Sequence, residues 1–445
     1  MRHRAGSVAF ARPIAAPVMT QNRLPDPDRS RLEENRLRTW AMQPMAGEPP
    51  TVLVLDGEQR AALAVVRSIG RYGCQVHVGS AIPRSLAGGS RYCRSEAVLP
   101  SPLVEPDSYC HAVVALSEQC GASIVLPISE PSILALLERP AQVDKMRAQV
   151  PLPDLAHFRA ASDKAEVLSL AQSIGIPVPA QWIISSRDDS VPEIPLEYYP
   201  VVVKPSRSVI EGPSARTKLS VLYANSPEHL ACALSELVAS AYPVLVQARV
   251  EGPGMGVFLL RWQGNTIARF AHRRIREKPP SGGVSVCSES IVAPKRLMEQ
   301  SMQLMAALDW SGVAMVEFKH DTRSGTTYLM EVNPRFWGSL QLAVDAGVDF
   351  PTYLVQLAIG LPVTPIHDWT VGARLKWELG ELDHLLARLL HSNRALDLPD
   401  ETPSRLATTL AVMNPCVPSQ RLEVLRLHDP LPAIREVHSW LRALW

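Results

Sequence analysis

The chain has 445 residues, of which 46% are hydrophobic, and this length allows two or three domains that each bury a core of their own. Its 45 lysine and arginine residues balance 44 aspartate and glutamate residues to a formal charge of +1, which excludes bulk attraction to nucleic acid or to an anionic membrane. No apolar run approaches the roughly 18 residues of a membrane-spanning helix, and the seven cysteines form no C-x-x-C pair. We therefore expect a cytoplasmic protein with reduced thiols, in which any anion-binding site is local.

The first 49 residues differ in character from the rest of the chain. Residues 1–25 contain four arginines and no acidic residue, and prolines interrupt the stretch. It also lacks the apolar core of a secretory signal. We expect residues 1–49 to be a disordered tail or the product of an early start codon, outside the folded part of the protein.

Residues 51–150 begin with the pattern of a strand, a helix and a second strand. An apolar run from Thr51 is followed by a glycine turn, an amphipathic helix that ends near Gly73, and another apolar run. The segments ASIVLPISE and PSILALLE add a further buried strand and helix, so we predict a small doubly wound sheet. The pair Asp56-Gly57 has two interpretations: a tight turn between strand and helix, or part of a substrate site at the carboxyl edge of the sheet.

The region 151–350 contains two lysines at the ends of predicted elements. Asp163, with a glutamate three residues later, predicts the N-terminal cap of a helix that Gly175 closes. Lys164 then lies in the first helical turn, where the helix dipole disfavours a cation unless an anion is nearby. Lys204 ends a predicted buried strand.

Further downstream, a hairpin is predicted about Gln263-Gly264-Asn265. The region 351–445 is expected to be rich in α-helix, because it contains helical patterns such as WELGELDHLLARLLHS together with scattered prolines.

Two carboxylates and an amide meet on the next predicted hairpin. Apolar runs flank a polar turn at 321–326, and a turn centred on Ser324 places Glu317 directly opposite Glu331, with Asn333 on the same face. Like charges in opposed positions destabilise a sheet, so we expect either a protonated carboxyl with a raised pKa or a hard cation such as Mg²⁺ between them. The alternative is a solvated surface pair. The other face of the hairpin is predicted to be core: Ala314, Val316, Phe318, Tyr328, Met330 and Val332.

The segments VEFKHD and YLMEVNPRFWGS, together with the two lysines, closely resemble the metal-binding strand pair and the phosphate-binding lysines of the ATP-grasp superfamily. The likeness spans about residues 51–350. It implies an α/β protein in which a βαβ pre-ATP-grasp domain at 51–150 precedes a two-subdomain ATP-grasp fold, with α+β nucleotide domains, at 151–350.

The resemblance also implies roles for individual residues. ATP would be bound by Lys164, Lys204, Gln247 and Glu251, the last two of which belong to the hinge segment VLVQARVEG. Mg²⁺ or Mn²⁺ would be held by Glu317, Glu331 and Asn333, and Arg335 would neutralise the transferring γ-phosphoryl group. Two features depart from the family pattern. The phosphate loop PSRSVIEGPSART, which is usually rich in glycine, contains a single glycine, Gly212. The hinge reads Gln-Ala-Arg, where an acidic residue often follows the glutamine.

A basic segment, HRRIREKPPSGGVSV, follows the hinge. We expect it to be a loop near the site of phosphoryl transfer, in which Arg276 and His272 contact an acyl phosphate and Ser281 to Gly283 form a mobile flap. The alternative is a solvated basic loop. Trp337, which follows Arg335 closely, is expected in the core rather than at a ligand.

The likeness is greatest to ligases that join a carboxylate to an amine. It implies an enzyme that uses ATP to convert a carboxylate into an acyl phosphate and then forms an amide or peptide bond, with release of ADP and phosphate. The expected partners are small-molecule carboxylates and amines, with a possible homodimer and with neither nucleic acid nor membrane. Two alternatives stay open: a bicarbonate-using carboxylase or carbamoyl-phosphate-type enzyme, and a non-catalytic ATP-binding module.

Overall fold

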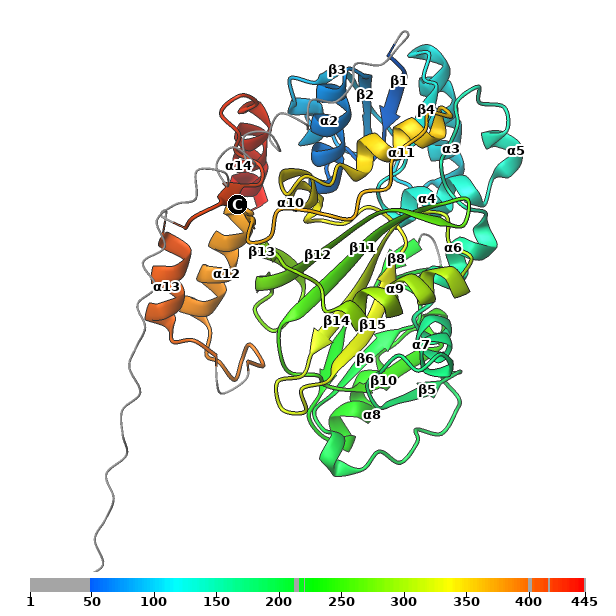
Figure 1. The fold of residues 1–445 in the computed structure, drawn as a ribbon. Helices are drawn as coiled ribbons and strands as arrows, with labels where there is room; N and C mark the ends of the chain where they lie inside the picture. Colours follow the sequence, from blue (N-terminus) through cyan, green and yellow to red (C-terminus); the bar gives the residue numbers. More distant parts are fainter. Residues whose placement is uncertain (1–48, 212–215, 220, 399–401, 415–416, 444–445) are drawn as a thin grey trace, which may run out of the picture. The chain divides into compact units, whose positions relative to one another are not determined.

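The computed structural model describes residues 49–211, 216–219, 221–398, 402–414 and 417–443, and Figure 1 shows their helices and strands. The predicted tail at 1–49, apart from Pro49, lies outside the described residues, and so does Gly212 of the predicted phosphate loop. Among the residues that are described, no helix is both long enough and apolar enough to cross a membrane.

The first sheet is parallel, with the strand order β3-β2-β1-β4. Its strands are β1 (Thr51–Val54), β2 (Gln75–Ser80), β3 (Cys93–Val98) and β4 (Ile124–Leu126), and its helices are α2 (Arg60–Tyr72), α3 (Pro106–Gln119), α4 (Glu130–Leu137) and α5 (Pro140–Val143). A short 3₁₀ turn, η1 (Ala87–Gly89), precedes β3. Helix α2 ends at Gly73, whose φ of 106° is readily adopted only by glycine. The predicted βαβ start is therefore confirmed.

Asp56, just after β1, contacts residues 128–132, which lie between the end of β4 and the first turn of α4. Its carboxylate accepts hydrogen bonds from the backbone N–H groups of Ile128 and Ser129, at 2.9 and 2.8 Å, and from the hydroxyls of Ser129 and Ser132. Asp56 is only 5% exposed. These contacts support the interpretation of Asp56-Gly57 as a tight structural turn.

A second, antiparallel sheet has the order β5-β10-β6-β9. Its strands are β5 (Gln181–Ile184), β6 (Val201–Pro205), β9 (Leu222–Ala224) and β10 (Val244–Ala248); α6 (Leu155–Ser162) and α7 (Lys164–Ser173) precede it, and α8 (Pro227–Ser235), η2 (Leu196–Tyr198) and η3 (Ala239–Ala241) connect its strands. The side chain of Asp163 accepts hydrogen bonds from the first-turn N–H groups of α7, as its position predicts. A separate strand pair, β7 (Val209–Glu211) and β8 (Arg216–Lys218), lies between β6 and β9 in the chain.

A third sheet has seven strands in the order β15-β14-β11-β12-β13-β16-β17. The strands are β11 (Gly254–Trp262), β12 (Asn265–Lys278), β13 (Val284–Ser290), β14 (Gly312–His320), β15 (Thr327–Asn333), β16 (Arg374–Lys376) and β17 (Gln420–Leu422). Strands β11 and β12 form the predicted hairpin, whose turn residues Gln263 and Gly264 both have positive φ angles.

The side chains of β11 point alternately to the two faces of this sheet, and each face packs in a different hydrophobic core. Phe258 and Leu260 pack with apolar residues of α2, α10 (Leu340–Asp345) and α11 (Phe350–Ala358). Val257 and Leu259 pack with residues of α6, α7 and α9 (Lys295–Ala307), and Figure 1 shows α9 and α11 beside the sheet. The sheet is therefore covered by helices from both earlier and later parts of the chain.

The sequence-based prediction of a basic loop at 272–278 is wrong. These residues are the second half of the long strand β12, which pairs with β13. The region after residue 350 contains the expected helices α12 (Glu378–Leu390), α13 (Arg405–Met413) and α14 (Leu431–Ala443). It also contributes two unforeseen strands, β16 and β17, which extend the third sheet from its β13 edge.

The hairpin of β14 and β15 has the predicted pairing of Glu317 with Glu331. The register shifts between Glu317 and Phe318, so that Phe318 pairs with Leu329 and a bulge forms at Met330. Leu329 is consequently fully buried, whereas Met330, predicted as core, lines a cavity. Tyr328, also predicted as core, is only partly buried.

Candidate active site

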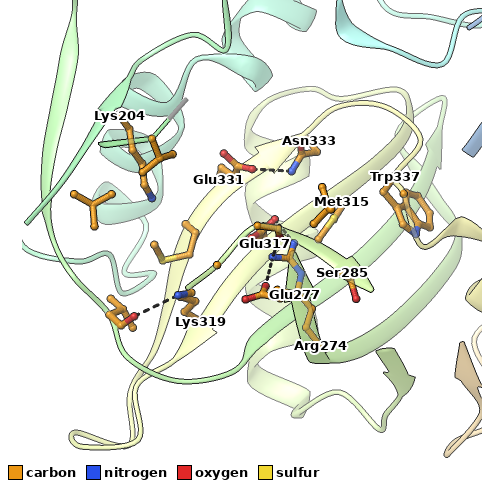
Figure 2. A pocket seen from close by; sticks show the side chains of 18 of the residues that line it. Lys204, Arg274, Glu277, Ser285, Met315, Glu317, Lys319, Glu331, Asn333 and Trp337 are labelled. Carbon is orange, nitrogen blue, oxygen red and sulfur yellow. Dashed lines mark hydrogen bonds and ion pairs between the residues drawn. The ribbon is translucent and has the colours of Figure 1, made fainter. Parts of the chain in front are cut away.

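A cavity of about 380 Å³ is lined by residues of both the second and the third sheets. Strands β6, β9 and β10 supply one side, and β12, β14, β15 and the segment 282–285 supply the other. Figure 2 shows charged side chains that project into it from several strands. Its cationic lining residues are Arg60, Lys204, Arg249, Arg274, Lys319 and Arg335, and its carboxylates are Glu277, Glu317 and Glu331.

Glu317 and Glu331 face each other across neighbouring strands, and cations pair with both. An Nη2–H of Arg274 donates to Oε2 of Glu317 at 2.6 Å, and Nζ of Lys164 lies 3.4 Å from Oε2 of Glu331. Burial raises the pKa of Glu317 above its ordinary value, although Arg274 opposes the rise. Burial would also raise the pKa of Glu331, but Lys164, Lys204 and the Asn333 amide together lower it to about 2. Basic side chains thus neutralise much of the negative charge of the two carboxylates. The sequence alone did not predict the pairing of Arg274 with Glu317.

Arg274 reaches Glu317 by crossing β11, the strand that lies between β12 and β14 in the sheet. It can do so because Gly254 occupies the crossing point: a Cβ there would lie only 2.9 Å from Cδ of Arg274. Arg274 also donates to Glu277, at 2.8 Å. Figure 2 marks this contact with a dashed line. Glycines spaced two residues apart in the strand, at 254 and 256, were the only sequence signal of this approach.

Asn333 and Arg335 continue the hydrogen-bond network at the end of β15. Asn333 donates from Nδ2 to Oε1 of Glu331 at 3.1 Å, and its Oδ1 accepts from Nη2 of Arg335 at 2.9 Å. Within the described part of the chain, no group of three or more His, Cys, Asp or Glu side chains could hold a metal ion. Carboxylate and amide oxygens are ligand types that Mg²⁺ prefers, so Glu317, Glu331 and Asn333 have suitable chemistry, although the Oδ1 of Asn333 here accepts from Arg335.

One end of the cavity contains Lys204 and Gln247. Burial lowers the pKa of Lys204 to about 8, with Glu331 opposing the shift and Lys164 adding to it. Gln247 is 1% exposed and donates from Nε2 to Gln181 at 3.0 Å, but its Oε1 accepts no hydrogen bond from any described residue. A buried acceptor without a donor is costly, so this atom is suited to bind an N–H group of a ligand.

The other end of the cavity contains His272, Trp337 and Ser339. His272 is 1% exposed, its Nδ1 lies 3.4 Å from Oγ of Ser339, and its Nε2 has no hydrogen-bond partner among the described residues. Burial, with Arg274 nearby, lowers the pKa of His272 well below its ordinary value, so the ring is neutral. Trp337 is 2% exposed and packs in the core as predicted, yet it also borders the cavity.

Three residues predicted for the site do not line this cavity. Lys164 approaches Glu331 from α7 and donates to Ser208 at 3.0 Å. Glu251 pairs with Arg323 at 2.7 Å. Arg276 donates to Glu381 at 2.7 Å and borders a different cavity, beside α12 and α13. The cavity does include Gly282 and Gly283 of the predicted flap.

Comparisons with known proteins identify sequences and folds that are similar to this chain. Residues 240–380 match a family model described as "ATP-grasp in the biosynthetic pathway with Ter operon". The chain is 21% identical, over 323 residues, to the C-terminal section of the carbamoyl phosphate synthase large chain of Methanopyrus kandleri. That alignment covers 70% of this chain and 51% of the relative, so the chain spans about half the length of that relative.

Two solved structures illustrate the similarity of fold. An L-amino acid ligase from Bacillus licheniformis aligns with a TM-score of 0.54 and 18% identity, over 71% of this chain and 75% of that one. A biotin carboxylase in complex with β-γ-ATP, from Campylobacter jejuni, aligns with a TM-score of 0.55 and 15% identity, over 74% of this chain and 75% of that one. At these identities the likeness establishes the fold, which enzymes with different reactions share.

Proposed function

Because residues 240–380 match an ATP-grasp family model, we propose that the chain is an ATP-grasp enzyme, an ATP-dependent ligase that activates a carboxylate as an acyl phosphate and joins it to an amine. The observation that carries this proposal is the facing pair Glu317 and Glu331, surrounded by cations in the wall of one cavity. Such a site can bind a metal-nucleotide complex and compensate the charge that develops as a phosphoryl group moves.

The reaction requires no covalent intermediate on the protein. An oxygen of the substrate carboxylate attacks the γ-phosphorus, the bond to the β,γ-bridging oxygen breaks, and ADP leaves. The amine then attacks the acyl carbon, phosphate leaves with the former carboxylate oxygen, and a proton is lost from nitrogen. Lys204 and Arg335 would contact the phosphates, whereas Lys164 would first have to leave Ser208. Glu317, Glu331 and Asn333 would hold Mg²⁺ or Mn²⁺, which supplies further charge compensation when bound.

The two ends of the cavity would divide the recognition of substrates. Oε1 of Gln247 would accept a hydrogen bond from the adenine amine, because it is buried without a donor. Glu251 would have to exchange Arg323 for ribose. At the opposite end, neutral His272 could contact the acyl phosphate from its unpaired Nε2, whereas Arg276 would first have to leave Glu381. We therefore centre the acyl-phosphate contacts on His272 and Arg335.

The comparisons also support a second candidate substrate. The relative from Methanopyrus kandleri is a carbamoyl phosphate synthase chain and one structural match is a biotin carboxylase, so bicarbonate could take the place of the organic carboxylate. The same phosphoryl transfer would then give carboxyphosphate. This alternative needs no change in the roles proposed above for the cations.

The test measures ADP and phosphate release from MgATP, with amino acids offered singly and in pairs and with bicarbonate as a separate arm. Wild type is compared with Glu331→Ala and with Glu299→Ala, which removes a carboxylate that is 63% exposed on α9. We expect release that requires an acid, rises with an amine, survives in the Glu299 variant and disappears in the Glu331 variant. Mass spectrometry of the product identifies the bond. ATP binding by calorimetry without turnover in any arm would instead identify a non-catalytic ATP-binding module.

A further inference from the structure

A second cavity, of about 250 Å³, adjoins the first. We call it the α14 pocket, and it is bounded by Glu58, Arg60, Arg84, Trp377, Glu436 and Ser439. Glu58 and Arg60 follow β1, Arg84 follows β2, Trp377 precedes α12, and the other two residues belong to α14. The pocket therefore lies beyond the carboxyl ends of β1 and β2, with the C-terminal helix as one of its walls.

Arg60 lines both the α14 pocket and the main cavity. Its guanidinium stacks on the ring of Trp377, with Cζ 3.8 Å from the ring centroid, and pairs with Glu423. On the side of the main cavity, Nη2 of Arg60 would lie 3.0 Å from a Cβ at Gly338, which is only three residues beyond Arg335. Arg60 thus lies between the α14 pocket and the segment proposed to perform phosphoryl transfer.

The hydrogen bonds of Asp56 help to explain where the α14 pocket lies. In open α/β sheets a ligand usually binds where the strand order reverses, which here is between β1 and β4. Asp56 fills that crevice with its hydrogen bonds to the backbone and hydroxyls at the end of β4. The open space at the carboxyl edge of this sheet is therefore displaced toward β2 and α14.

The charges around the α14 pocket favour a carboxylate. Arg435 also lines it but is occupied, since it donates to Ser85 O at 2.9 Å and to Glu96 at 3.1 Å. Arg84 is exposed and has no hydrogen bond or ion pair with a described residue.

Two carboxylates, Glu58 and Glu436, also line the α14 pocket. Glu58 accepts a hydrogen bond from Ser80 at 2.8 Å. Burial raises the pKa of Glu436 to about 7, although Trp377 donates to it, so its negative charge is reduced. Arg84 is thus the guanidinium available to a ligand.

We propose that the α14 pocket binds the carboxylate end of the amine substrate, and that this substrate is a peptide or another amine with a carboxylate several bonds away. Its amino group would reach past Arg60 into the main cavity, while Arg84 would hold its carboxylate by paired N–H donors. This inference rests on the proposed function and assigns a substrate class to it. It also gives the C-terminal helix a direct part in substrate recognition.

The experiment uses the full chain and two matched probes, trialanine and trialanine amide, which lacks the carboxylate. Calorimetry in the presence of MgADP compares wild type with Arg84→Gln and with Ser439→Trp, which fills the pocket. The controls are Lys295→Gln, at a lysine that is 90% exposed on α9, and His438→Trp, an exposed neighbour on α14 that does not line the pocket. We expect wild type and both controls to bind trialanine at least tenfold more tightly than the amide. Both pocket variants should lose that preference.

Other results overturn the proposal or separate it from the ligase function. Equal affinity of wild type for the two probes, no binding of either probe, or unchanged preference in Arg84→Gln would each overturn the α14 pocket as a carboxylate site. If the preference is present and lost as expected while wild type releases no ADP, the pocket stands and the ligase function fails. If ADP release depends on Glu331 but the KM for trialanine is the same in Arg84→Gln, the ligase stands and the pocket assignment fails.

Discussion

Replacement of Glu423 by glutamine should remove a pH-dependent part of the stability of the C-terminal region. Glu423 follows β17, is 4% exposed and pairs with Arg60, while its Oε1 has no hydrogen-bond partner among the described residues. Burial raises the pKa of Glu423 to about 7. Arg60 opposes this rise, and the nearby carboxylates of Glu378 and Glu436 add to it.

The sign and size of the effect follow from the difference between the folded and unfolded states. The folded pKa lies above the ordinary value of 4.5, so the native state keeps a proton that the unfolded chain releases. The resulting stabilisation is fully present below pH about 4.5 and is lost as the pH rises through about 7. One pKa unit corresponds to about 1.4 kcal/mol, so the whole contribution is about 3 kcal/mol. The amide introduced by Glu423→Gln cannot titrate, so the variant lacks this dependence.

The assay is urea unfolding of wild type and Glu423→Gln at several pH values between 5 and 7. The free energy of unfolding of wild type, relative to the variant, should fall by about 2 kcal/mol between pH 5 and 7, because the slope halves as the pH reaches the folded pKa. Titrating groups distant from Glu423 are common to both proteins and cancel in this difference. Glu299→Gln, at an exposed position on α9, controls for loss of a carboxylate. Parallel pH profiles of wild type and Glu423→Gln would show that Glu423 stays ionised and would refute the reasoning.

Four further results are expected. Gln247→Leu should raise the KM for ATP about tenfold with little change in kcat, because it removes an unpaired buried acceptor; an unchanged KM would contradict its contact with adenine. Lys204→Met should lower kcat/KM about 100-fold in the ADP-release assay by removing a cation beside Glu331, and a loss below tenfold would contradict a phosphate contact. Asp56→Ala should lower the free energy of unfolding by about 3 kcal/mol in urea, because several buried donors lose their acceptor; a loss under about 1 kcal/mol would show that the turn holds without it. Chelation by EDTA should stop ADP release and Mn²⁺ should restore it, whereas turnover in EDTA would exclude the metal site.

The register of the carboxylate pair was predictable because a short polar turn fixes which residues of a hairpin face each other. The bulge at Met330 was not predictable, since both Leu329 and Met330 are apolar and either could occupy the core. The pairing of Arg274 with Glu317 was also hidden, because it crosses an intervening strand and depends on the absence of a side chain at Gly254.

A shift in strand register at Arg276 changes which side chains of β12 line the cavity. Strict alternation along β12 would place Arg274 and Arg276 on the same face as His272. The register of β12 against β13 shifts on both sides of Arg276, and Arg276 pairs with Glu381 of α12 while Glu277 lines the cavity. Likewise, β16 and β17 are three residues long and 43 residues separate them in the chain, so no periodic pattern could have indicated their place in the sheet.

The distribution of charge gives an independent reason to expect an anionic ligand. The chain as a whole is nearly neutral, with a formal charge of +1. Among the residues that the structure describes, six cationic side chains and three carboxylates line the main cavity, while its histidine is neutral. An excess of cations at short range is unfavourable unless an anion compensates it, because charges in a cavity of low dielectric interact more strongly than in water. A nucleoside triphosphate remains an anion after it binds Mg²⁺, and the metal would compensate the facing carboxylates as the phosphates compensate the lysines and arginines. The metal and the nucleotide should therefore bind cooperatively, and titration of ATP by calorimetry should show much weaker binding in EDTA than in excess Mg²⁺.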